Sequence, residues 1–299
     1  MHKTKRYRKQ VRNFICFLIP SLLVYTIFWV VPIIFNFVVS ASSWNGMSAL
    51  SETKWVAMRN YVKIFTNDTM FPKAFGHNII YTIITVIFIP LISCILAILV
   101  ERFVVRKGLF RTLFFVPAIV PLLAAAILFQ WIYSIDGGLL NELLGKIGLQ
   151  NLQRNFLGDS QTALVAVSFI NVWKSIPFYM TILISGLQGI SQELEEAAKI
   201  DGANGRKVLR YVTLPLLKPI LVIVFGLVII DGFRTFDLIY ATTNGGPNYA
   251  TEIMTTYIYR VGFGDFRMGY ATALSSVNIV FVLLITSVYL RISNKSNTE

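Results

Sequence analysis

The chain has 299 residues, of which 55% are hydrophobic and only 14% are charged, and its mean hydropathy is +0.65. Soluble domains usually carry about a quarter charged residues, so this composition excludes an ordinary soluble enzyme and indicates a chain built for a lipid bilayer. The net charge of +12 does not indicate nucleic-acid binding, because the Lys and Arg residues fall in short groups between apolar runs. Cys16 and Cys94 lie inside apolar stretches and the two His residues lack metal-ligand spacing, so neither a disulfide framework nor a metal site is expected.

Apolar runs divide the chain into candidate membrane spans. Runs without a charged residue cover residues 13–51, 74–100, 112–135 and 268–290. Each exceeds the ~20 residues that a helix needs to cross a ~30 Å hydrocarbon core. Two further apolar stretches, near residues 161–187 and 217–241, contain ionisable residues. The sequence therefore predicts an all-α polytopic membrane protein whose transmembrane domain covers residues 14–292, with six helices at about 14–40, 77–100, 112–133, 161–187, 217–241 and 270–291.

The first apolar run follows a basic segment, residues 1–13, as in a signal peptide. The apolar core of a cleavable signal has only 7–15 residues, and this run is about twice as long. We therefore expect an uncleaved first span.

The positive-inside rule sets the expected orientation. The N-terminus, the second-to-third connection, the fourth-to-fifth connection and the C-terminus together carry 17 Lys and Arg residues, whereas the other three connections carry eight. We predict that both termini are cytoplasmic, with residues 1–13 and 293–299 as the terminal segments. The long connections at residues 134–160 and 242–269 would then lie outside.

Residues 189–216 form the longest connection on the predicted cytoplasmic side. Ser191 is a suitable N-cap, three Glu residues follow in the first turns, and Gly202 can end the helix in a left-handed conformation. Beyond it, residues 206–212 are basic and amphipathic, and we expect Pro215 to end this stretch before the fifth span. From the residues alone, the segment is either a docking surface for a partner or a helical hairpin that only joins two spans.

Several motifs of this segment and its surroundings occur together in one known family. They are Glu196-Ala197-Ala198 with Gly202 and Val212-Thr213-Leu214-Pro215, then Thr243-Asn244-Gly245-Gly246-Pro247, and Gly269-Tyr270-Ala271-Thr272-Ala273. In this order the chain resembles binding-protein-dependent ABC importer permeases of the sugar type, similar to the inner membrane components of maltose transporters, over residues 14–291. It departs from the pattern at Ser191, where Pro is frequent, at Glu195, where Tyr is common, and at Arg59, where Gly often stands.

The resemblance implies partners and site residues. It makes residues 189–216 the coupling loop of an ATP-driven importer, whose helix sits in a cleft of a cytoplasmic ATPase dimer. The residues expected to make this coupling are Glu196, Ala197, Ala198, Asp201 and Gly202. The resemblance further implies a second homologous permease, an extracytoplasmic solute-binding protein and a carbohydrate substrate, with ATP and Mg held by the ATPase and no cofactor on this chain. Gly245, Gly246 and Pro247 would contact the solute-binding protein or the neighbouring permease.

Polar residues inside the spans are candidates for the translocation pathway. An ionisable residue at the centre of a span costs about 2.5–3.5 kcal/mol on insertion, so it usually faces a cavity or a partner. Aromatic rings and hydrogen-bonding groups together suit a sugar. The candidates are Asn171, Trp173, Lys174, Phe178, Asp231, Arg234, Asp237 and Asn278.

Five of these candidates have an alternative structural interpretation. Asp231, Arg234 and Asp237 are each three residues apart, so on one helix they would line one side and could neutralise one another. Lys174 either meets the substrate or pairs with Asp231 or Asp237 to hold two helices together. Asn278 could instead make an interhelical hydrogen bond.

Residues 253–261 carry apolar side chains at helical spacing, among them Ile253, Met254, Tyr257 and Val261. This pattern indicates either a helix that lies at the outer membrane interface or one that packs against the spans.

The sequence favours a transport subunit over an enzyme. It has no P-loop, no His-Glu-x-x-His and no nucleophile motif, so ATP hydrolysis would come from a separate subunit. We predict one permease subunit of an ABC importer for a mono- or oligosaccharide, in the bacterial cytoplasmic membrane. The alternatives are ABC import of glycerol phosphates or another polar organophosphate, and an ion-coupled secondary transporter.

Overall fold

The structure is a computed structural model that describes the backbone of residues 2–298, together with all side chains in that range except those of residues 2–6, 8–10, 103 and 294–298. No strand occurs within residues 2–298. The chain divides into two compact units, one of Met1–Asp68 with Ile258–Val277 and one of Thr69–Tyr257 with Asn278–Glu299. Most of the predicted basic N-terminus and of the tail at residues 293–299 lies outside the described side chains.

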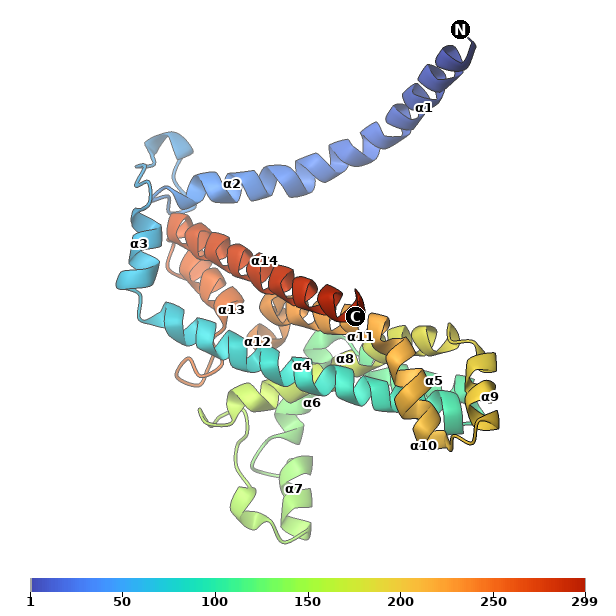
Figure 1. Cartoon of the computed structure of the whole chain (residues 1–299). Helices are drawn as coiled ribbons and strands as arrows, with labels where there is room; N and C mark the ends of the chain where they lie inside the picture. The colour runs from blue at the N-terminus through green and yellow to red at the C-terminus, as the bar shows by residue number, and fades with distance from the viewer. Residues whose placement is uncertain (1, 299) are drawn as a thin grey trace. The chain divides into compact units, whose positions relative to one another are not determined.

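Three long helices form the centre of the larger unit. Helix α4 (Met70–Phe103) packs along α8 (Ala163–Gln188), and both contact α11 (Leu214–Arg234), as Figure 1 shows. Their facing side chains are aliphatic or aromatic and bury each other's apolar surface. This core includes Ile89, Ala97, Val172, Met180, Leu183, Leu217, Val224 and Val228.

The third predicted span is bent. Helices α5 (Lys107–Ile119) and α6 (Leu122–Ile132) meet at an angle of 90°. Proline disfavours helical backbone in the residue before it, and Val120, which precedes Pro121, is extended with φ −59° and ψ 124°. The prediction of one continuous helix over residues 112–133 is therefore wrong.

The fifth predicted span begins earlier and ends sooner than expected. Helix α10 (Gly205–Val208), the π-helical turn η4 (Leu209–Thr213) and α11 form one run from Gly205 to Arg234, so Pro215 does not stop the helix. Pro215 lies at the start of α11, directly after the wider turns of η4. The run breaks at Thr235 and Phe236, and α12 (Asp237–Thr242) is a separate short helix. The predicted span over residues 217–241 is thus two helices.

The first, second, fourth and sixth predicted spans are each continuous runs of helix. Helices or helix runs that are long and apolar enough to cross a membrane cover Val11–Ser40, Met70–Arg102, Ala163–Gln188, Gly205–Arg234 and Met268–Ser293. The bent pair α5 and α6 raises the number from five to as many as six. This confirms a helical, polytopic chain.

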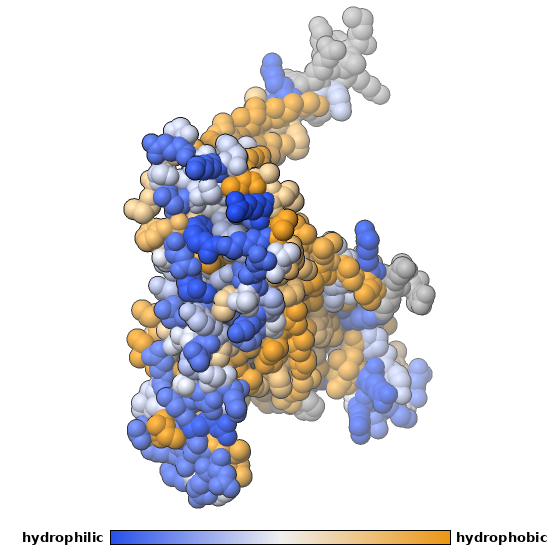
Figure 2. All heavy atoms as spheres, turned by 90° about the vertical axis from the view of Figure 1, so that its left-hand side faces the viewer, coloured by the Kyte–Doolittle hydropathy of each residue, from blue (hydrophilic) through white to orange (hydrophobic). Residues whose placement is uncertain are grey.

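The connection between α6 and α8 forms a small folded segment. It contains α7 (Leu139–Lys146) and a 3-10 turn, η3 (Gln150–Leu152). The buried Asn141 holds it together, because its amide donates to the carbonyls of Ser134 at 2.6 Å and Arg154 at 2.9 Å. Figure 2 shows a mainly hydrophilic lobe at the bottom of the view, where this segment lies, below the hydrophobic surface of the long helices.

The smaller unit combines the N-terminal helices with the start of α14. It contains α1 (His2–Tyr25), η1 (Thr26–Val30), α2 (Val31–Ser40), η2 (Leu50–Glu52), α3 (Arg59–Thr66), η5 (Arg260–Gly264) and the first residues of α14 (Met268–Thr298). The Asn60 amide donates to the carbonyls of Ser40 and Ser42, both at 2.8 Å. The Gly269 N–H donates to the backbone carbonyl of Trp44. These bonds join α3, the end of α2 and the start of α14.

Candidate functional site

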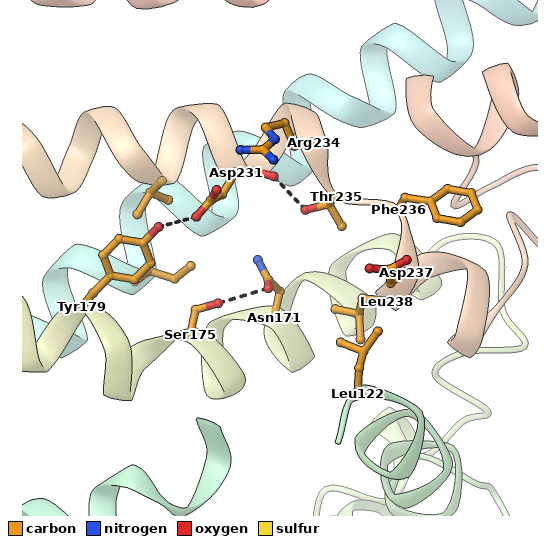
Figure 3. Close-up of a pocket in the computed structure, with 12 residues that line it drawn as sticks. Leu122, Asn171, Ser175, Tyr179, Asp231, Arg234, Thr235, Phe236, Asp237 and Leu238 are labelled. Carbon is orange, nitrogen blue, oxygen red and sulfur yellow. Dashed lines mark hydrogen bonds between the residues drawn. The ribbon is translucent and has the colours of Figure 1, made fainter. Parts of the chain in front are cut away.

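A polar cavity lies where α11 ends in the larger unit. It has a volume of about 330 Å³ and is bordered by α4, α6, α8, α11 and α12. The side chains shown in Figure 3 come from both sides of the break in the fifth span. The lining residues are Ile89, Leu122, Asn171, Ser175, Tyr179, Val228, Asp231, Arg234, Thr235, Phe236, Asp237 and Leu238.

Side chains from neighbouring helices stabilise the break that shapes this cavity. Carbonyls at a helix end lack intrahelical partners, and within a membrane they need another donor. The Asn78 amide donates to the Gly232 carbonyl at 3.0 Å, and the Thr255 hydroxyl donates to the carbonyl of Thr235. The Thr235 N–H and hydroxyl both donate to the Asp231 carbonyl.

Two hydrogen bonds order the polar side chains of the cavity. The buried Tyr179 donates its hydroxyl to the Asp231 carboxylate at 2.6 Å, and the Ser175 hydroxyl donates to the Asn171 amide oxygen at 3.1 Å. Figure 3 shows Asn171 on α8 pointing toward the helix that carries Asp231. The Asp231 carboxylate is therefore held from α8 while it still faces open space.

The three ionisable residues of the fifth span surround the cavity, but they do not share one helix face. Asp231 and Arg234 belong to the last turns of α11, whereas Asp237 begins α12 after the break. All three side chains are exposed to the cavity or its opening. The expectation of one charged stripe is wrong, because Thr235 and Phe236 are not helical.

Lys174 lies away from the cavity lining. Its ammonium group donates to the carbonyl of Val120 at 2.6 Å. Val120 is the C-cap residue of α5. No ion pair among the described side chains joins Lys174 to Asp231 or Asp237, so the predicted pairing between spans is wrong. Lys174 instead supplies a donor where the third span breaks.

The remaining pathway candidates also lie outside the cavity lining. Trp173 packs against Phe129 of α6 with ring centroids 5.1 Å apart, and Phe178 makes an edge contact with Tyr179. Asn278 is on α14. The structure thus brings together Asn171, Asp231, Arg234 and Asp237. It adds Ser175 and Tyr179, which the sequence analysis did not select although they stand four and eight residues after Asn171, on the same helical face.

The candidate coupling residues lie on and directly after helix α9 (Gln192–Ile200). The Ser191 hydroxyl accepts from the Glu193 N–H at 3.3 Å, and Gly202 has φ +85°, so both predicted helix ends are confirmed. Glu196, Ala197, Asp201 and Gly202 are exposed, and Ala198 is half-buried. The helix therefore presents these residues on its surface.

Two neighbouring charged residues at the end of α4 bind different elements, and Arg102 is the one that contacts α9. Arg102 pairs with Glu195 at 2.5 Å and donates to the Thr213 hydroxyl, while Glu101 pairs with Lys107 at 2.9 Å. Neither Arg102 nor Glu195 was among the predicted coupling residues, and Glu195 was noted only as a departure from the family pattern. A Glu in place of the common Tyr was the available signal that a basic side chain lies nearby.

The turn after α12 is folded against itself. The Gly246–Pro247 peptide is cis, the Thr243 and Thr251 hydroxyls are 2.7 Å apart, and Thr251 donates to the Gly246 carbonyl at 2.7 Å. Gly245 is buried, whereas Gly246 and Pro247 are half-buried.

The apolar residues that follow this turn are buried. Ile253 and Met254 are fully buried, and Tyr257 of α13 (Met254–Tyr259) is 5% exposed. Of the two predicted arrangements, this burial supports a helix that packs against the spans, and it disfavours a helix that lies at the outer membrane interface.

Known proteins share this sequence pattern and fold. Residues 89–296 match the family described as "Binding-protein-dependent transport system inner membrane component". The probable ABC transporter permease YurN of Bacillus subtilis is 33% identical, over 95% of this chain and 96% of that protein. The trehalose/maltose transport system permease MalF of Thermococcus litoralis is 31% identical, over 96% and 95%.

A solved structure shows the same fold. It is a bacterial alginate ABC transporter in complex with an alginate pentasaccharide-bound periplasmic protein, and it matches with a TM-score of 0.84 at 20% identity, over 97% of this chain and 96% of that one. The chain therefore belongs to the family of binding-protein-dependent transport system inner membrane components, and it is a multi-pass inner-membrane protein with the ABC permease fold.

Proposed function

We propose that the chain is a permease subunit of an ATP-driven importer for a carbohydrate, in which it forms half of the translocation pathway. The observation that carries this proposal is the polar cavity at the break of the fifth span. One relative supports the substrate class, because it is named for trehalose and maltose transport.

The cavity has the chemistry of a passing sugar site. A sugar offers many hydroxyls that both donate and accept, and the cavity offers an amide at Asn171, a hydroxyl at Ser175 and carboxylates at Asp231 and Asp237. Leu122 and Leu238 supply apolar surface at the same site. Weak, multiple contacts of this kind suit translocation, since a tightly bound cargo would not leave.

The charges of the cavity disfavour an anionic cargo. Asp231 and Asp237 contribute two carboxylates against the single guanidinium of Arg234, and Lys174 donates to the Val120 carbonyl instead of facing the cavity. An organophosphate would meet net negative charge there. Membership of a binding-protein-dependent family also disfavours an ion-coupled secondary transporter.

The orientation follows from the charge distribution. With the 17 basic residues inside, both termini and residues 189–216 are cytoplasmic, and α7 and the turn at residues 243–251 are outside. Gly246 and Pro247 would then face the solute-binding protein or a second, homologous permease. Lipid surrounds the spans, and ATP and Mg belong to a separate ATPase dimer.

Helix α9 would transmit the ATPase movement. It is joined to α8 at one end and, through α10 and η4, to α11 at the other, and these two helices border the cavity. Its exposed Glu196, Ala197 and Asp201 would sit in a cleft of the ATPase.

The proposal is tested by reconstituting the chain with its ATPase, its second permease and its solute-binding protein in proteoliposomes, and measuring uptake of labelled oligosaccharides and glycerol phosphates. We expect ATP-dependent uptake of a neutral sugar. Asn171→Ala should lower the uptake rate about tenfold by removing hydrogen bonds worth about 1.4 kcal/mol to the passing cargo. Uptake of the phosphate compounds alone, or uptake without ATP, would contradict the proposal.

A further inference from the structure

The last turn of α4 carries two charged neighbours that reach different helices. Arg102 pairs with Glu195 of α9 at 2.5 Å and also donates to the hydroxyl of Thr213 in η4. The same Glu195 oxygen accepts from the Thr213 hydroxyl at 2.8 Å. These three residues, which we name the α4–α9 bridge, join the end of α4, the start of α9 and the base of α11.

Glu101, the other neighbour, binds the opposite set of elements. Its carboxylate accepts from Lys107 at 2.9 Å and from Arg111, both on α5, and from the Gln188 amide at the end of α8 at 3.1 Å. A polar cavity of about 360 Å³ lies among these groups, lined by both Glu101 and the three residues of the bridge. One turn of α4 thus connects the ends of α5, α8, α9 and α11.

The α4–α9 bridge is partly shielded from solvent. The Thr213 residue is 1% exposed, and the side chains of Arg102 and Glu195 are 21% and 27% exposed. Charge-assisted hydrogen bonds are stronger than neutral ones, and a partly buried pair is screened less than a surface pair. The first turn of a helix also favours a carboxylate, which suits Glu195 on α9.

The bridge provides a connection that the chain itself does not. Helix α9 is covalently continuous with α8 and with the α10–α11 run, but α4 is separated from it by some 90 residues of sequence. Helix α4 packs along α8 and α11 and contributes Ile89 to the cavity at the break of the fifth span. Among the described side chains, Arg102 of α4 forms an ion pair with α9, so a displacement of α9 would reach α4 directly through it.

We infer that the α4–α9 bridge makes α4 move with the coupling helix, so that Arg102 and Glu195 are positioning residues for the coupling of ATP hydrolysis to transport. This inference rests on the proposed function. Movement of α9 would then reach the cavity by three routes: through its covalent connection to α8, through its covalent connection to the α10–α11 run, and through the bridge to α4.

The test measures coupling, not transport alone. Glu195→Gln and Arg102→Met are reconstituted in the complete transporter, and cargo molecules taken up per ATP hydrolysed are counted. We expect this ratio to fall about fivefold in each variant, the lower end of the usual range for coupling between sites, without a fall in ATPase activity in the absence of cargo. Glu193→Gln is the matched control, because it removes the same charge from an exposed position in the same helical turn.

A second pair of measurements separates positioning from folding. The exchanged pair Arg102→Glu with Glu195→Arg should recover at least half of the lost ratio. In a chain with Cys16→Ser and Cys94→Ser, spin labels at Val105→Cys and Lys199→Cys, both exposed, should show one narrow distance distribution when the bridge is intact. The distribution should become broad when Glu195→Gln is added.

The outcomes distinguish the two proposals. A normal ratio and a narrow distance in Glu195→Gln would overturn the inference while leaving the proposed function intact. A complete transporter that hydrolyses ATP without any uptake would overturn the proposed function and the inference with it. If Arg102→Met does not assemble, the Glu195→Gln ratio and distance decide alone.

Discussion

Lys174 provides the most direct test of how the bent third span is held. Its ammonium group donates to the Val120 carbonyl at the C-terminal end of α5, where the helix gives way to Pro121 and α6. Replacing Lys174 with Met keeps a long unbranched side chain and removes the donor. We expect Lys174→Met to loosen the bend and to lower the stability of the folded chain.

The structure allows the size of this effect to be worked out. A hydrogen bond to a charged group contributes about 1.5–3 kcal/mol, and a cation at a helix C-terminus adds about 0.3–1 kcal/mol. Desolvation of the half-buried Lys174 ammonium opposes both contributions, and Met inserts more easily into the bilayer. A net loss of about 2 kcal/mol remains, which corresponds to a decrease in Tm of about 3 °C for a chain of 299 residues.

The assay is thermal unfolding in detergent, combined with spin-label distances between α5 and α6. Lys174→Arg should stay close to the wild type, since a guanidinium can also donate to the carbonyl. Lys73→Met, which removes an exposed lysine from α4, is the control. An unchanged Tm and unchanged distances in Lys174→Met, together with weaker cargo binding, would refute the capping role and return Lys174 to the translocation pathway.

Two glycines give further predictions. Gly232→Ala should lower the free energy of unfolding by about 1–3 kcal/mol and reduce uptake, because the new Cβ would lie 2.6 Å from the Thr82 hydroxyl of α4. Thermal unfolding measures the loss, and Gly76→Ala, at an open position, is the control. Adding Thr82→Ala should restore the stability of Gly232→Ala. Gly202→Val should abolish uptake while membrane insertion and ATPase activity persist. A β-branched residue disfavours φ +85° by at least about 1–2 kcal/mol, so the end of α9 would shift. Gly205→Val, at a position without a positive φ, is the control and should transport normally. Normal uptake by Gly202→Val would exclude α9 as the coupling element.

Features that depend on short stretches of sequence were predictable. The charge-free runs located the apolar helices, because a helix in lipid needs a minimum apolar length whatever surrounds it. Ser191 and Gly202 predicted the ends of α9, because capping and the left-handed conformation are decided within one or two residues. Asn171 and Asp231, both selected as polar residues within a span, line the same cavity.

The breaks in the third and fifth spans were not predicted, for different reasons. Pro121 was a visible signal for the first break, but an apolar run hides it when only hydropathy is counted. The second break has no proline. It depends on two donors from other parts of the chain. Asn78 of α4 binds the Gly232 carbonyl, and Thr255, which follows the turn after α12, binds the Thr235 carbonyl. Such partners become apparent only when the helices are packed.

These breaks also explain why polar residues inside the spans do not form one class. Each break frees backbone carbonyls in a region without bulk water, so each must be accompanied by polar side chains that donate to them. Lys174 at the third span and Asn78 at the fifth serve this need, and neither lines the cavity. Asp231, Arg234 and Asp237 make no such bond to a freed carbonyl among the described contacts, and they face the cavity. A polar residue in a span is therefore a candidate for cargo contact only after the hydrogen-bond needs of the nearest helix break have been met by another residue.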